Sequence, residues 1–157
     1  MTVPVAGAAG HQPFTGPAAP TAPPSRTRRL SGPLLLAGGV LAASVLLHLR
    51  DPHRSGSWGY CPWLMLTGTY CPGCGGLRAV NDLTHADLAA AASSNLLLVA
   101  ALPALAAWWL RTLADRWRGV GRHVPAGRQL RVAGGVLALA VVFAVARNTP
   151  AGAWLAP

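Results

Sequence analysis

The sequence has no lysine and no glutamate, and its 157 residues include only 4 acidic side chains. Charged residues make up 11% of the chain and hydrophobic residues 52%, whereas an ordinary soluble domain is roughly 25% charged. A chain of this length cannot hide so much apolar surface in one soluble core. These shortages favour an integral membrane protein, in which lipid takes the place of a packed core.

Charge is also absent from the N-terminal segment. Residues 1–25 contain six prolines and no charged side chain, so they have neither helical periodicity nor the apolar pattern of a core. We predict a disordered tail over residues 1–29, which ends in arginines just before the first apolar run. The membrane domain is then residues 30–157.

Three apolar runs follow, and they predict transmembrane helices over about residues 30–49, 90–110 and 130–147. The first run has about the ~20 residues that a bilayer core requires. Pro103 inside the second run predicts a kink near Ala100. The third run is short for a span at ~1.5 Å per residue, so a tilted or re-entrant interfacial helix is its alternative.

The 13 basic residues are all arginines, and they predict the orientation. Nine lie before the first run or in the basic loop 111–129 and at its edge, and four lie between the first two runs or after the third. Because arginines are retained in cytoplasmic loops, we expect a cytoplasmic N-terminus and an extracytoplasmic loop 51–86. A multi-pass protein of the plasma (inner) membrane fits this pattern, and the Arg-, Ala- and Gly-rich composition favours a bacterial source. Arginines that flank spans also explain the net charge of +9 without a nucleic-acid partner.

All 3 cysteines lie in the loop 51–86, as Cys61-Pro62 and as Cys71-Pro72-Gly73-Cys74-Gly75. The residues around them are too apolar for a free loop and too few for a span, so the loop is expected at the membrane interface. A short helix is predicted after Gly76. Its first amides and the positive charge of Arg78 would lower the pKa of a nearby thiol.

Three interpretations of the cysteines remain open. Cys71 and Cys74 could form a redox pair, in which one thiol attacks and the other resolves. They could instead bind zinc, with Cys61 as a third ligand and His53 or His85 as a fourth. They could also form a structural disulfide, which an extracytoplasmic location favours. A single Cys-x-x-Cys does not choose among these.

The same segment resembles a family of short bacterial membrane proteins known as the domain of unknown function 2752 family. Its members carry a Cys-Pro, a Cys-Pro-x-Cys-Gly about ten residues later, then Thr-Arg-Ala and an Asn-Pro at the next span. The matching residues here are Cys61-Pro62, Cys71 to Gly75, Arg78-Ala79 and Asn95, while Leu77 and Leu96 replace the Thr and the second Pro. The resemblance implies a membrane location and an important cysteine segment, and no activity comes with it.

We therefore expect an all-α integral membrane protein with three transmembrane helices and a cysteine-bearing interfacial loop between the first and second. The expected function is non-enzymatic: an outward loop that is structural, disulfide-bonded or metal-binding, with zinc as the candidate metal, and that contacts a partner. The alternative is a membrane thiol-disulfide oxidoreductase that uses Cys71, Cys74 and Arg78. The metal candidates are Cys61, Cys71, Cys74 and His85. Besides the lipid bilayer, a membrane-protein partner or a homo-oligomer is expected, since small-residue helix faces pack closely.

Overall fold

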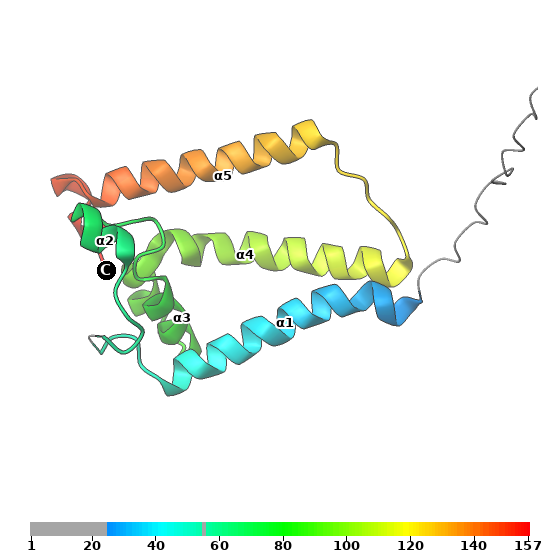
Figure 1. The fold of residues 1–157 in the computed structure, drawn as a ribbon, viewed down its shortest axis with the longest axis horizontal. Helices are drawn as coiled ribbons and strands as arrows, with labels where there is room; N and C mark the ends of the chain where they lie inside the picture. Colours follow the sequence, from blue (N-terminus) through cyan, green and yellow to red (C-terminus); the bar gives the residue numbers. More distant parts are fainter. Residues whose placement is uncertain (1–24, 55) are drawn as a thin grey trace, which may run out of the picture.

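The computed structural model describes residues 25–54 and 56–157, and every regular element in these ranges is helical (Figure 1). In chain order the elements are α1 (Arg26–Leu49), α2 (Pro62–Thr67), α3 (Gly76–Thr84), α4 (Leu88–Arg118), α5 (Ala126–Arg147) and the 3-10 helix η1 (Pro150–Leu155). The all-α fold with three membrane-length helices is confirmed. The predicted tail lies outside the described residues up to residue 24.

Three helices are long and apolar enough to cross a bilayer, namely α1, α4 and α5. The mean hydropathy of their most apolar windows is 2.0, 1.8 and 2.0 in that order. The shortest of them, α5, has 22 residues, which at ~1.5 Å per residue is ~33 Å against a hydrocarbon core of ~30 Å. The protein is therefore a multi-pass membrane protein.

The helices extend beyond the predicted spans at the arginine-rich ends. Helix α1 begins at Arg26, inside the predicted tail, because Ser25 caps it by accepting a hydrogen bond from the Arg28 amide at 3.4 Å. Helix α4 continues to Arg118 and α5 begins at Ala126, so both ends of the predicted basic loop 111–129 are helical. A short connection joins these two helices.

Pro33 lies inside α1 without ending it. A proline has no amide hydrogen, so the carbonyl four residues earlier, that of Arg29, loses its helical partner. The guanidinium of Arg116 in α4 donates to that carbonyl at 3.3 Å, and the Trp109 indole donates to the Pro33 carbonyl at 3.2 Å. Side chains of α4 thus supply hydrogen bonds to backbone carbonyls at the start of α1, as membrane helices require.

Helix α4 is interrupted at Asn95, whose φ of −159° and ψ of 91° are not helical. Among the residues of α4, Asn95 alone departs from helical φ/ψ, so this break lies before the kink predicted near Ala100 from Pro103. The Asn95 side-chain oxygen accepts the Leu98 amide at 3.0 Å. Asn95 is in effect the N-cap of a second helical segment.

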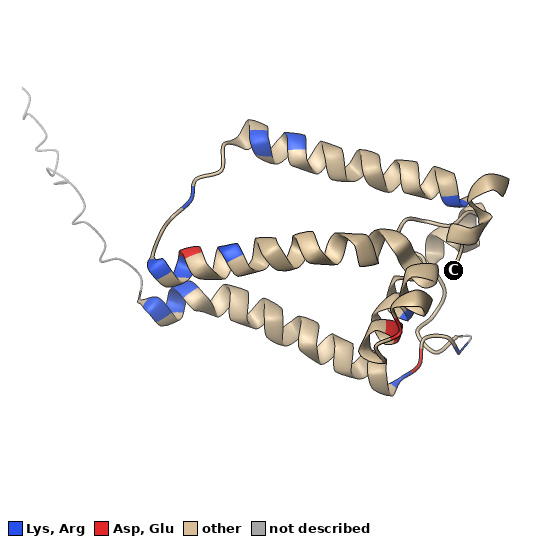
Figure 2. Ribbon diagram, turned by 180° about the vertical axis from the view of Figure 1, so that it is seen from behind, with Lys and Arg blue, Asp and Glu red and all other residues tan. Residues whose placement is uncertain are grey.

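The two ends of the bundle differ in charge, as Figure 2 shows. Arginines gather where α1 begins, α4 ends and α5 begins, whereas α2, α3 and the cysteine loop lie at the opposite end. The nine arginines counted on one side of the sequence-based topology are thus separated in space from the other four. We call the end of the bundle with the nine arginines the basic end, and the opposite end, with α2, α3 and the three cysteines, the cysteine end.

Helix α5 packs differently from the other two long helices. Helix α1 packs against α3 and α4, and α3 packs against α4, while the main contact of α5 is with η1. Only 6% of the most apolar window of α5 is buried. The helices thus form two groups, α1 with α3 and α4, and α5 with η1. The two groups meet chiefly at the cysteine end, where η1 also contacts α4.

Candidate metal centre

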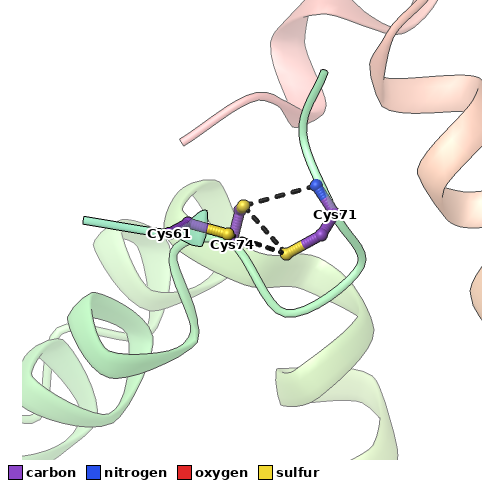
Figure 3. Close-up of side chains that lie close together, drawn as sticks. All are labelled: Cys61, Cys71 and Cys74. Carbon is purple, nitrogen blue, oxygen red and sulfur yellow. Dashed lines mark hydrogen bonds between the residues drawn. The ribbon is translucent and has the colours of Figure 1, made fainter. Parts of the chain in front are cut away.

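The three cysteines come together at the cysteine end (Figure 3). Cys61 is the N-cap residue of α2, and Cys71 and Cys74 lie in the turn between α2 and α3. The Sγ atoms of Cys61 and Cys71 are 3.6 Å apart, those of Cys71 and Cys74 are 2.9 Å apart, and all three lie within 4.8 Å of one another. Among the described residues, no other His, Cys, Asp or Glu joins this group.

Proline and glycine at fixed positions produce this arrangement. Pro62 begins α2 at a position where the missing amide hydrogen costs nothing. Gly68 ends α2 with φ of 68°, and Gly75 precedes α3 with φ of 79°, both in the left-handed region that favours glycine. A Cβ at Gly75 would also overlap the carbonyl oxygen of Ser94 in α4. The turn from Cys71 to Gly75, which we call the cysteine turn, can therefore lie directly against the backbone of α4.

None of the three cysteines forms a disulfide. A disulfide bond is ~2.05 Å long, well short of the 2.9 Å between the closest sulfurs. The turn is closed instead by backbone contacts: the Cys74 amide donates to the Cys71 carbonyl at 3.1 Å, and the Cys71 amide donates to the Cys74 sulfur at 3.3 Å. The disulfide that the sequence left open is thus not formed in this geometry.

The cysteines differ in acidity. Burial raises the pKa of the Cys74 thiol to about 12, and its neighbours Cys71 and Cys61 add to the rise. The pKa of Cys61 is lowered, chiefly by the backbone of Leu64 in the first turn of α2. The expectation that a helix start and Arg78 would lower the thiol pKa is therefore wrong for Cys74, where burial outweighs them. A bound cation would offset both the burial and the mutual repulsion of three thiolates.

Arg147, the last residue of α5, holds the cysteine turn from one side. Its side chain is only 1% exposed. One terminal nitrogen donates to the carbonyls of Cys71 and Cys74, each at 3.0 Å, and the other donates to the Leu155 carbonyl of η1 at 2.9 Å. A buried guanidinium thus joins α5, η1 and the cysteine turn at one point.

Asn95 holds the turn from the other side. It is 2% exposed, and its amide nitrogen donates to the carbonyls of Pro72 and Cys74 at 3.0 and 3.1 Å. Its oxygen caps the helix that follows, as described above. At the break in α4, Asn95 therefore contacts both the cysteine turn and the helical segment that follows.

Asn148, directly after α5, makes a third contact. Its side-chain oxygen accepts the Tyr70 amide and its nitrogen donates to the Tyr70 carbonyl, both at 2.8 Å. This pair of hydrogen bonds resembles a rung of an antiparallel ladder. It fixes the backbone immediately before Cys71.

The two histidines considered as fourth ligands lie elsewhere. The ring of His85 stacks on that of His48 with centroids 4.3 Å apart, and its Nδ1 contacts the Asn81 carbonyl at 2.9 Å. His53 donates to the buried carboxylate of Asp82 at 2.7 Å. The structure thus brings Cys61, Cys71 and Cys74 together and leaves His85 and His53 apart from them.

A cavity of about 480 Å³ opens beside the sulfurs, and all three cysteines contribute to its wall. Arg78, the second residue after the start of α3, also lines it, as does Arg54. The half-buried Arg78 forms no hydrogen bond or ion pair with the part of the chain that the structure describes. Arg78 thus lines the same cavity as the three cysteines, and its charge is available to a ligand.

Sequence reasoning missed the role of Arg147 and gave Asn95 only a modest packing role. Arg147 was counted as one of the four arginines of the outer side, and nothing in the local pattern distinguishes it from a flanking charge. The Asn at the start of the second span is a weak signal, since a polar residue there also suits a helix cap. Both roles depend on contacts with residues more than 20 positions away.

The fold and the site together define a class: a multi-pass helical membrane protein with a three-cysteine cluster able to hold a metal ion. Residues 61–109 match the model of a family described as "Protein of unknown function (DUF2752)". This confirms the resemblance for the segment that runs from Cys61 into α4. No curated protein and no solved structure matches the chain.

Proposed function

We propose that Cys61, Cys71 and Cys74 bind one zinc ion, which fixes the loop between α1 and α4 at the membrane surface of a non-enzymatic plasma-membrane protein. The observation that carries this proposal is the convergence of three sulfurs within 4.8 Å from two separate parts of the loop. Cys61 is ten residues from Cys71, and α2 lies between them. A turn that served only to close the loop would need no third sulfur.

Zinc suits these donors better than other common cations. Thiolates select zinc over magnesium and calcium, which prefer oxygen. A tetrahedral zinc with bonds of ~2.3 Å holds its sulfurs ~3.8 Å apart, close to the 3.6 Å between Cys61 and Cys71. Cys71 and Cys74, at 2.9 Å, separate slightly on binding, and Gly73 between them allows the turn to open.

The metal would complete a junction that side chains have already begun. Arg147 and Asn95 tie the Cys71–Cys74 turn to α5 and α4. Zinc would add Cys61, and with it α2, whose exposed Trp63, Met65 and Leu66 suit the bilayer interface. The free energy of metal binding would thereby stabilise the arrangement of the interfacial helix on the bundle.

The cysteine end is proposed to face the extracytoplasmic side of the plasma membrane. The separation of nine arginines from four, now seen at opposite ends of the bundle, supports this orientation. The cysteine end, exposed on that side, would contact a membrane-protein partner or a second copy of the chain. The poorly buried α5 leaves an apolar surface for either.

Metal analysis of the purified full chain tests the proposal. We expect about one zinc per chain in the wild type and its loss in Cys61→Ser and Cys74→Ser. The matched control is His85→Ala, since His85 was a candidate ligand that the structure places away from the sulfurs; it should retain its zinc. Equal zinc content in Cys74→Ser and the wild type would end the proposal.

Thiol labelling tests the orientation separately. In intact cells treated with a chelator, a membrane-impermeant maleimide should reach Cys61, whose lowered pKa makes it the readier nucleophile. Labelling that appears only after the cells are lysed would invert the topology. Gly121→Cys, in the connection between α4 and α5, is the control for the opposite side of the membrane and should be labelled only after lysis.

A thiol-disulfide oxidoreductase remains the second candidate, and the 2.9 Å between the sulfurs of Cys71 and Cys74 favours it. Alkylation of membranes with and without reductant distinguishes it from the zinc centre. An oxidoreductase would show a Cys71–Cys74 pair that changes with the applied redox potential. A thiol state that does not respond removes this candidate.

A further inference from the structure

The proposed zinc centre lacks a fourth protein ligand. Three cysteines supply three donors, and no other His, Cys, Asp or Glu among the described residues lies in the same group. Zinc sites with three protein ligands keep the fourth position for water or a ligand. The position left open determines what such a centre can bind.

The cavity beside the sulfurs is where that ligand would lie. It measures about 480 Å³ and its wall includes Cys61, Cys71 and Cys74. This volume falls within the ~300–1,000 Å³ of small-molecule sites. A zinc ion held by the three sulfurs would therefore have the cavity within reach of its open position.

The side chains of the cavity favour an anion. Arg54 and Arg78 line it, whereas no aspartate or glutamate does so in the described ranges 25–54 and 56–157. The two guanidinium groups give this wall positive charge, which attracts an anion.

The unpaired guanidinium of Arg78 narrows the class of anion. Its guanidinium has no partner among the described residues, and the planar fork of an arginine matches a carboxylate through two parallel hydrogen bonds. A carboxylate oxygen is also a normal zinc ligand. The aromatic rings of Trp58, Tyr60 and Tyr70 in the same wall provide apolar surface for the rest of the molecule.

We propose that this cavity binds a monocarboxylate, with its carboxylate between the open position of the metal and Arg78 and its apolar part against the aromatic wall. The inference rests on the proposed zinc centre. No covalent step is involved, and the ligand exchanges with a metal-bound water. The protein would thus act as a receptor for small carboxylates at the cysteine end.

Cobalt substitution makes the open position visible, because a change of the fourth ligand alters the visible absorption of a cobalt site. The full chain in detergent is loaded with Co²⁺ and titrated with sodium butyrate at constant ionic strength, with sodium chloride as the blank. We expect a saturable spectral change in the wild type. Arg78→Gln should bind cobalt with unchanged stoichiometry but need about tenfold more butyrate, as the loss of a charged hydrogen-bond donor predicts.

The controls separate the two proposals. Arg111→Gln makes the same substitution at the basic end and should match the wild type. A chain that takes up no cobalt overturns the metal centre and this inference with it, whereas a cobalt-loaded chain that does not respond to butyrate overturns only the carboxylate site. Equal butyrate affinity in Arg78→Gln, or tighter binding of inorganic phosphate than of butyrate, also overturns the site as proposed.

Discussion

Replacing Arg147 with methionine should release the cysteine turn from α5. Methionine fills a similar volume but donates no hydrogen bond. The substitution therefore leaves the carbonyls of Cys71, Cys74 and Leu155 without the guanidinium donors that lie 2.9–3.0 Å from them. The chain should still form its three membrane helices, because these depend on apolar length and not on this contact.

The cost depends on which hydrogen bonds remain. A buried polar group left without a partner costs roughly 1–3 kcal/mol, but the Cys74 carbonyl keeps its bond from Asn95 and the Cys71 carbonyl keeps its bond from the Cys74 amide. The substitution also removes a buried charge whose Nε has no partner in the described structure, which returns part of the cost. We therefore expect the cysteine turn to be less stable by about 3 kcal/mol, because three hydrogen bonds from a charged donor are lost and the Leu155 carbonyl is left without its Arg147 donor.

The rate of Cys74 alkylation in metal-free protein measures this change. Cys74 is 8% exposed, so alkylation requires local opening, and about 3 kcal/mol corresponds to a rate increase of roughly a hundredfold. Arg131→Met, near the exposed start of the same helix, is the control and should leave the rate unchanged. A rate for Arg147→Met within twofold of the wild type would refute the reasoning.

Three further predictions concern the same turn. Gly75→Ala should abolish zinc binding, because the added Cβ meets the α4 backbone. Gly68→Ala is the control: its φ is also positive but the space around it is open, so it should lower the melting temperature and keep its zinc. Equal zinc loss in both variants would contradict this. Asn95→Asp should lose zinc affinity as Asn95→Ala does, since aspartate keeps the helix cap but not the donors to the turn, and wild-type affinity in the Asp variant would show that the cap alone matters. In metal-free protein the neutral Cys74 thiol stabilises the fold below pH 9.0 and its contribution is lost as pH rises towards about 12, so the melting temperature should fall over that range in the wild type but not in Cys74→Ser.

The sequence-based account of the membrane helices agrees closely with the structure because its cause is local. A run of apolar residues with the length of a bilayer becomes a helix whatever it packs against, since lipid offers no partner to its backbone. The helix ends were less predictable. Ser25 and Gly119 cap α1 and α4 beyond the apolar runs. The arginine-rich ends of these helices are not apolar, so the length of an apolar run does not predict them.

The position of the break in α4 shows the limit of local rules. Pro103 is the expected site of a kink, yet the backbone departs from helical φ/ψ at Asn95. The Asn95 conformation is stabilised by the carbonyls of Pro72 and Cys74. A contact across more than 20 residues thus decided where the helix bends.

The sequence alone determined that this is a membrane protein with three apolar spans, that its arginines are unequally distributed, and that its cysteines lie in one short loop rich in proline and glycine. Composition, apolar length and turn-forming residues act locally, so they can be read along the chain. Only the tertiary structure decided which ligands meet. It joined Cys61 to the Cys71–Cys74 turn, directed His85 to His48 instead, and buried Arg147 against the turn, because these placements depend on how α4, α5 and the loop pack together.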